Sequence, residues 1–230
     1  MNYYQLKITL ELKTDIYFDE VTEKLSILLN KSMLYNDYLK SIHKVNTYKL
    51  YVFEGLSPFE RDKTYKKGNF YMTRLRCIDE FIAQSFRECL KNTNTNEFEV
   101  LSVDIEKIIF RPVKEIYNVT PAIASIEGKP WTNNMDIEII KNSINSNTLK
   151  KIKIINGLEK VLEHDMIKAI EVKNIKPIAF KYKGKKLIGN KFNIKINEDD
   201  LSQMMAYIAI STGLLEKNSL GYGYCLCKYS

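Results

Sequence analysis

The segment GLLEKNSLGYG, residues 213–223, lies between an amphipathic helical pattern and a final apolar stretch that is typical of a strand. Its glycines bracket a short polar turn that contains Lys217 and Asn218. These glycines are Gly213, Gly221 and Gly223. Glycine allows positive φ and close backbone approach, and such a turn can present amide groups to a phosphate. Because nucleotide-binding glycine loops usually follow the first strand of a fold, this late position favours a phosphate-bearing polymer over ATP or NAD.

The first half of the chain alternates between strand and helix patterns. Apolar residues occupy every second position from Tyr4 to Leu12, which predicts a strand with one buried face. Residues 18–36 have helical spacing, and residues 37–48 are polar and indicate irregular structure. The next predicted elements are strands at 48–56 and 69–76, a helix that begins near 78, and a strand at 98–110, in which Leu101, Val103 and Ile105 share one face. This order, β-α-β-β-α-β, is the ferredoxin-like unit.

The second half repeats that order. We predict a strand at 116–126, a helix at 133–149, strands at 167–172, 178–182 and 186–196, a helix capped by Asp199 or Asp200, and a last strand at 222–228. Residues 183–185 are expected at a hairpin tip. The predicted fold class is therefore α+β, with two tandem ferredoxin-like (RRM-like, βαββαβ) units and a C-terminal glycine-rich loop. The expected domains are residues 1–113 and 114–230.

Charge points to a polyanionic partner. The formal net charge is +7, and 45% of the 230 residues are hydrophobic, which is ordinary for a globular protein. The base composition of a genome could also produce a chain rich in Lys, Asn and Ile, so charge alone does not decide the question. No apolar run is long enough to span a bilayer, and the N-terminus lacks the pattern of a signal peptide. We therefore expect a cytoplasmic protein with no membrane partner.

The four cysteines predict neither a metal site nor a disulfide. They form no CxxC pair, and no histidine lies at zinc-finger spacing from them. These residues are Cys77, Cys89, Cys225 and Cys227. The two histidines lie far apart, with no cluster of acidic ligands beside them. We expect no cofactor.

Two ferredoxin-like units in a basic chain that ends in the 213–223 segment resemble the repeat-processing endoribonucleases of CRISPR systems, which belong to the RAMP superfamily. Residues 120–123 and 71–76 are also similar to patterns of that family. The resemblance implies metal-independent cleavage of repeats in precursor CRISPR RNA. The ribose 2′-OH would attack the phosphate and leave a 2′,3′-cyclic phosphate and a 5′-OH end. Other subunits of a CRISPR effector complex and a homodimer stay open as partners.

The resemblance also implies a catalytic histidine just after the first helix, with a lysine or tyrosine nearby, and His43 occupies that position. An imidazole titrates near neutral pH, so His43 could be the general base or the general acid. Lys49 could stabilise charge on the phosphate. Tyr38 is the nearer tyrosine candidate and Tyr35 the other. A tyrosine of the family often lies within the first helix, where this chain has Leu28 or Leu29.

Lysine clusters are the candidates for RNA binding. Lys217 and Asn218, with the glycines of their turn, would hold backbone phosphates. The lysines around the second-half hairpin match a hairpin with which the family grips RNA. This cluster is Lys181, Lys183, Lys185, Lys186 and Lys191, and a loop of the first half adds Arg61, Lys63, Lys66 and Lys67. A solvated hairpin and a solvated loop remain the alternatives for these clusters. His164, flanked by acids, is expected to be structural or exposed.

Three function classes remain open. The first is the repeat-cleaving endoribonuclease, and the second is a non-catalytic RAMP subunit that binds guide RNA. The third is an unrelated RNA-binding protein with tandem ferredoxin-like units. His43 favours the first class over the second, and the glycine-rich turn argues against the third.

Overall fold

The alternating N-terminal segment forms an inner strand of a four-stranded antiparallel sheet. Its order is β3-β5-β1-β6, and β1 pairs with β5 on one side and β6 on the other. The strands are β1 (Asn2–Leu12), β3 (Tyr51–Phe53), β5 (Phe70–Cys77) and β6 (Phe98–Ile109). Leu6, Ile8 and Leu10 are fully buried, so the predicted face of β1 lies in the core. A short pair, β2 (Ile16–Tyr17) with β4 (Thr64–Tyr65), lies outside this sheet.

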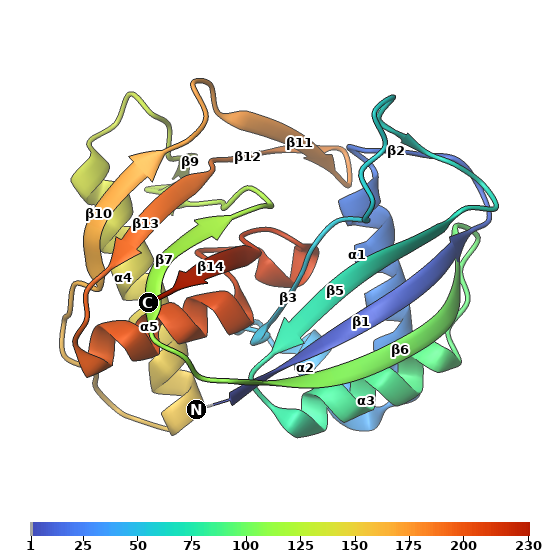
Figure 1. Ribbon diagram of the computed structural model, residues 1–230, viewed down its shortest axis with the longest axis horizontal. Coiled ribbons are helices and arrows are strands. Elements are labelled where there is room, and N and C mark those ends of the chain that lie inside the picture. The colour runs from blue at the N-terminus through green and yellow to red at the C-terminus, as the bar shows by residue number, and fades with distance from the viewer. Residues whose placement is uncertain (1) are drawn as a thin grey trace. The chain divides into compact units, whose positions relative to one another are not determined.

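Three α-helices and a 3₁₀ turn cover the apolar face of this first sheet. In the computed structural model, which describes residues 2–230, they lie on one side of the sheet (Figure 1). They are α1 (Val21–Ser32), η1 (Met33–Tyr35), α2 (Asp37–Lys44) and α3 (Glu80–Lys91). Buried leucines of α1, such as Leu25 and Leu28, share one core with Phe86 of α3.

The second sheet repeats the strand order of the first. Its order is β10-β13-β7-β14, again with antiparallel neighbours. The elements are β7 (Val113–Asn118), α4 (Ile137–Asn156), β10 (Ile167–Val172), β13 (Phe192–Ile196), α5 (Asp200–Thr212) and β14 (Cys225–Tyr229). Helix α5 packs against β7, β13 and β14, and α4 packs against β10 and α5. The prediction of two tandem β-α-β-β-α-β units is therefore confirmed.

Two hairpins are added to the second unit. One joins β8 (Ser125–Ile126) to β9 (Lys129–Pro130), and the other joins β11 (Ile178–Tyr182) to β12 (Lys185–Gly189). Lys183 and Gly184 form the tip of the second hairpin and both have positive φ, as a two-residue turn of type I′ requires. This hairpin tip was expected from the sequence.

The chain divides into two compact units. The first contains residues 2–109 together with Ser219–Gly221, and the second contains Phe110–Asn218 and Tyr222–Ser230. The short 3₁₀ turn η2 (Asn218–Leu220) is thus shared between them. The boundary after residue 113 stays a prediction about which segments fold independently.

Four expectations about local structure were wrong. The strand expected at 116–126 ends at Asn118, and the next strand, β8, begins only at Ser125. Residues 37–44 form helix α2, because Asn36 caps it by accepting a hydrogen bond from the Leu39 amide and Leu39 is fully buried. Leu101 is 46% exposed, because the β1–β6 register shifts after Thr9 and leaves Leu101 unpaired. The strand expected at 186–196 is broken after Gly189, where Asn190 pairs instead with Ala122.

We next consider membrane-spanning helices, cysteines and clusters of metal ligands. No helix among residues 2–230 is both long and apolar enough to cross a membrane. All four cysteines are free thiols, and three of them are buried. Burial raises the pKa of the Cys77 thiol. Within the described residues, no group of three or more His, Cys, Asp and Glu side chains is placed to hold a metal ion.

Candidate functional site

His43 lies in the last turn of α2, and its side chain is exposed. Across the part of the chain that the structure describes, no hydrogen bond or ion pair of its ring was found. An exposed imidazole without such bonds is available to a substrate. It can therefore accept or donate a proton, which is the ability that general acid–base chemistry needs.

Lys49 holds the turn that carries His43. Its ammonium donates hydrogen bonds to the carbonyl oxygens of Ile42 and Val45 and, at 3.2 Å, to that of His43. The last carbonyls of a helix have no partner within the helix, and a cation there also opposes the helix dipole. Desolvation lowers the pKa of Lys49. The structure therefore brings Lys49 and His43 together, through the backbone of His43.

Tyr38 is also on α2, and its ring packs edge-on against Phe81 of α3 at a centroid distance of 5.0 Å. The residue as a whole is 44% exposed. Tyr35 is more exposed, in the 3₁₀ turn before α2. Leu28 and Leu29, the first-helix positions at which the resemblance would place a tyrosine, are buried in the core. Tyr38 thus helps to hold α2 on α3 and keeps its edge open to solvent.

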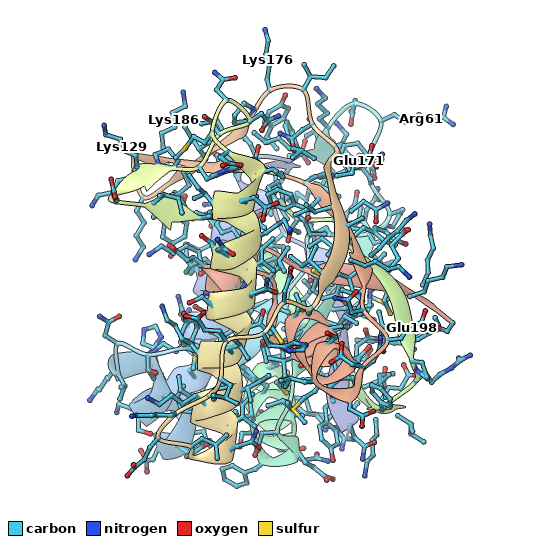
Figure 2. All side chains as sticks on the ribbon, turned by 90° about the vertical axis from the view of Figure 1, so that its left-hand side faces the viewer. Arg61, Lys129, Glu171, Lys176, Lys186 and Glu198 are labelled. Atoms are coloured by element: carbon cyan, nitrogen blue, oxygen red, sulfur yellow. The ribbon has the colours of Figure 1, made fainter. Side chains whose placement is uncertain are left out.

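The basic loop of the first unit has both engaged and unengaged side chains. Lys66 pairs with Asp62 at 2.8 Å, and this bond raises the pKa of Lys66. The Lys63 ammonium lies 5.4 Å from the centre of the Phe18 ring. Arg61 and Lys67 are exposed, and the Arg61 side chain extends into solvent (Figure 2).

The connection between α5 and β14 is folded around one buried amide. Asn218 is 8% exposed, and its Nδ2 donates to the carbonyls of Leu214 (3.0 Å) and Tyr222 (2.9 Å). Its Oδ1 accepts a hydrogen bond at 2.7 Å from Lys151, which also donates to Gly213 O at 2.6 Å. The Asn218 side chain therefore fixes the shape of the connection.

Lys151 is the interior group that sequence reasoning missed. It is 1% exposed on α4, and burial lowers its pKa to about 7. A lysine in a helix with several other lysines gives no sequence signal that it points inward. Only the tertiary structure reveals its contact with the 213–223 connection.

The glycines of this connection meet strict backbone requirements. Gly213 and Gly223 have positive φ, and a Cβ on Gly223 would lie 2.1 Å from the carbonyl oxygen of Leu214. Gly221 also has positive φ, and a Cβ there would meet the side chains of Phe53 and Thr22. Lys217 is exposed and itself has a φ of 59°. The connection therefore presents Lys217 outward while its glycines pack tightly.

The hairpin lysines project from the β11–β12 ribbon. Lys185 and Lys186 are exposed, and the Lys183 ammonium lies 5.7 Å from the centre of the Tyr182 ring. The side chain of Lys181 lies outside the described residues. Strand β9 contacts β12, which adds Lys129 to this basic surface. Figure 2 shows Lys129, Lys176 and Lys186 extending into solvent, and sequence reasoning missed the first two.

His164 has a structural position. Its Nε2 lies 2.9 Å from Ser202 Oγ and 3.1 Å from Asp199 Oδ1, at the N-terminus of α5. Asp199 caps that helix by accepting a hydrogen bond from the Ser202 amide. The cap predicted at Asp199 or Asp200 is therefore Asp199, with His164 packed against it.

No protein-family model matches the chain, and no curated protein matches it in sequence. Solved structures do match it over nearly its whole length. One is a RAMP protein described as binding different RNA substrates, with 15% identity over 98% of this chain and 99% of that one and a TM-score of 0.75. The chain has the RAMP and Cas6 fold. The product of a Cas6-related gene from Pyrococcus furiosus is 16% identical over 98% of both chains, with a TM-score of 0.71.

A CRISPR-associated Cas6 protein is likewise 16% identical, over 98% of this chain and 99% of that one, with a TM-score of 0.66. These matches cover both ferredoxin-like units. At such identities the likeness concerns the fold, and the function has to be argued from this chain's own residues.

Proposed function

We propose that this protein is a metal-independent endoribonuclease that cleaves the repeats of precursor CRISPR RNA. The observation that carries the proposal is the exposed His43 at the end of α2, held by Lys49, in a chain with the Cas6 fold. In this reaction the 2′-oxygen attacks phosphorus and loses its proton. The bond from phosphorus to the 5′-oxygen breaks, and that oxygen gains a proton. A 2′,3′-cyclic phosphate and a 5′-OH result, and no water is consumed.

His43 takes one of the two proton transfers, as base toward the 2′-OH or as acid toward the departing 5′-oxygen. Lys49 would act mainly as a positioning residue, because its ammonium is directed at the carbonyls of α2. Tyr38, whose edge remains open, is the candidate second group that could hydrogen bond to the phosphate.

RNA would be held by the basic surfaces. The exposed candidates are Lys183, Lys185 and Lys186 of the hairpin, Lys217 of the connection, and Arg61 and Lys67 of the first-unit loop, to which the half-buried Lys66 is added. Lys66 would have to exchange Asp62 for a phosphate, which costs little for an exposed pair. Asn218 would support binding through the shape of the connection, because its amide is buried.

A non-catalytic RAMP subunit is the second candidate. It is favoured by the Lys49 contacts, because an ammonium engaged by carbonyl oxygens is not aimed at a substrate. The RAMP protein that matches this chain is described as binding different RNA substrates. The two candidates differ in one respect, which is chemistry at His43.

Cleavage of a labelled CRISPR repeat RNA in EDTA tests the proposal. We expect wild type to cut it, His43→Ala to bind without cutting, and His164→Ala, the matched control, to cut normally. A substrate with 2′-deoxyribose at the scissile position should remain intact. Normal cutting by His43→Ala would refute the assignment of the residue, and tight binding without cutting by wild type would favour the non-catalytic subunit.

A further inference from the structure

The second sheet has a hollow of about 340 Å³ on the face that points away from its helices. Tyr117 of β7 and Asn193 of β13 are register partners there, next to the paired Ile116 and Ile194. Both isoleucines are fully buried, and side chains alternate along a strand. Tyr117 and Asn193 therefore face outward, and they form the floor of what we call the Tyr117 pocket.

Cations outnumber anions around the Tyr117 pocket. Lys173, Lys191 and Lys228 line it, with one carboxylate, Glu115. Lys228 pairs with Glu115 at 2.7 Å and holds the pKa of that carboxyl below its usual range. Lys173 pairs with Glu171 at 2.9 Å, outside the lining. Among the described residues no ion pair of Lys191 was found, so its charge is available to a ligand.

The exposed ion pairs do not prevent anion binding. Lys173 and Glu171 are both at least half exposed, and such pairs contribute little to stability. In the other pair Lys228 is exposed but the Glu115 side chain is only 12% exposed, so Lys228 stays with that carboxylate. The Lys173 ammonium can turn from Glu171 to a phosphate oxygen and keep a charged partner. The pocket volume lies at the lower end of the range for small-ligand sites, which suits one nucleotide better than a folded RNA element.

Asn193 supplies an unused hydrogen-bond acceptor. Its Oδ1 is buried and accepts no hydrogen bond in the structure. Asn193 and Glu115 both line the pocket, and Asn193 adds to the lowering of the Glu115 pKa. A buried acceptor without a donor is unfavourable, and a ligand N–H group would satisfy it.

We propose that the Tyr117 pocket binds one nucleotide of a single-stranded RNA. The base packs on the Tyr117 ring, an N–H group of the base donates to Asn193 Oδ1, and the phosphate meets Lys191 with Lys173. Aromatic rings beside cations are the usual means of holding single-stranded RNA, and every base has a face that can stack. The choice of RNA as the ligand rests on the proposed function. The site itself is separate from His43.

Binding of fluorescent hexaadenylate, measured by anisotropy, tests the Tyr117 pocket. Removing the ring in Tyr117→Leu should weaken binding by about five- to 150-fold, the worth of one stacked base. Tyr117→Phe keeps the ring and should bind as wild type does. Lys114 lies on the same strand as Tyr117 but does not line the pocket. Lys114→Ala is therefore the matched control for charge, and it should weaken RNA binding less than Lys191→Ala does.

The hydrogen bond has its own test. An oligomer of unsubstituted purine riboside lacks the adenine amino group, so wild type should bind it more weakly than hexaadenylate. Asn193→Ala should bind the two oligomers equally, because the acceptor is gone. This comparison within one variant does not depend on how well that variant folds.

The outcomes separate this inference from the proposed function. Wild-type affinity in a folded Tyr117→Leu overturns the Tyr117 pocket, even if wild type cleaves repeat RNA. If Asn193→Ala still binds hexaadenylate more tightly than the purine riboside oligomer, as wild type should, then Asn193 Oδ1 does not accept a hydrogen bond from the base. AMP that binds as tightly as hexaadenylate would show that the ligand is a free nucleotide, which contradicts the assignment to RNA. Failure of wild type to bind any RNA would overturn both proposals.

Discussion

Gly223 and Gly184 form a matched pair for testing how the 213–223 connection is packed. Their φ values are 74° and 73°, so alanine at either site must adopt the same left-handed backbone, at about 1–2 kcal/mol. Their surroundings differ. A Cβ at Gly184 meets nothing within 4 Å, whereas a Cβ at Gly223 would lie 2.1 Å from the Leu214 carbonyl oxygen.

Relief of that contact would disturb two hydrogen bonds. The Leu214 amide donates to Gly223 O at 2.8 Å, and Asn218 Nδ2 donates to Leu214 O at 3.0 Å. Each bond contributes about 0.5–1.5 kcal/mol net, so their loss adds about 1–3 kcal/mol. We therefore expect Gly223→Ala to cost about 2–5 kcal/mol in total and Gly184→Ala about 1–2 kcal/mol.

Denaturant unfolding followed by tryptophan fluorescence measures both variants. Trp131 is the only tryptophan, it is 2% exposed, and it packs against Phe192 in the unit that contains both glycines. One probe therefore reports on both substitutions. Equal losses of unfolding free energy in Gly223→Ala and Gly184→Ala would refute the reasoning, because the left-handed backbone is all that the two sites share.

Two further predictions concern lysines. Lys151 has a pKa of about 7 when folded and an ordinary pKa of 10.5, so the unfolded chain binds a proton that the native protein lacks between those values. Because of Lys151, the free energy of unfolding should therefore rise between about pH 7 and about pH 10, by at most about 1.4 kcal/mol per pH unit. Lys151→Met should lose that rise and Lys150→Met should keep it, as unfolding free energies at pH 6.5 and 9 would show. Lys49→Met should fray the end of α2 and slow cleavage more than it weakens RNA binding; an unchanged cleavage rate would contradict the capping role.

The topology could be predicted because its signals are local. The alternation in β1, the helical spacing of α3 and the turn at Gly184 each depend on neighbours within a few residues. Each of these elements stands in the structure close to where the sequence places it. Once the two halves showed the same order of elements, the sheet order followed from the ferredoxin-like unit.

The errors concern features that depend on distant parts of the chain. Helix α2 has only eight residues, and it is held by the burial of Leu39 and by Lys49 from beyond its end. Leu101 is exposed because the pairing register between β1 and β6 shifts beside it. No local sequence pattern in β6 predicts that shift. In both cases a tertiary contact decides the outcome against a weak local preference.

The same distinction applies to the candidate site. Sequence reasoning assigned Lys217 and Asn218 the same task, yet the first is exposed and the second is buried with its amide engaged. Lys151 and Asn218 shape the 213–223 connection from inside. Several of its backbone amides, such as those of Leu214 and Gly223, already donate to carbonyl oxygens, so Lys217 is the group that an anion would meet from outside. Asn218→Ala should therefore reduce stability and RNA affinity together, whereas Lys217→Ala should reduce affinity alone. A loss of affinity without a loss of stability in Asn218→Ala would instead place that amide in direct contact with RNA.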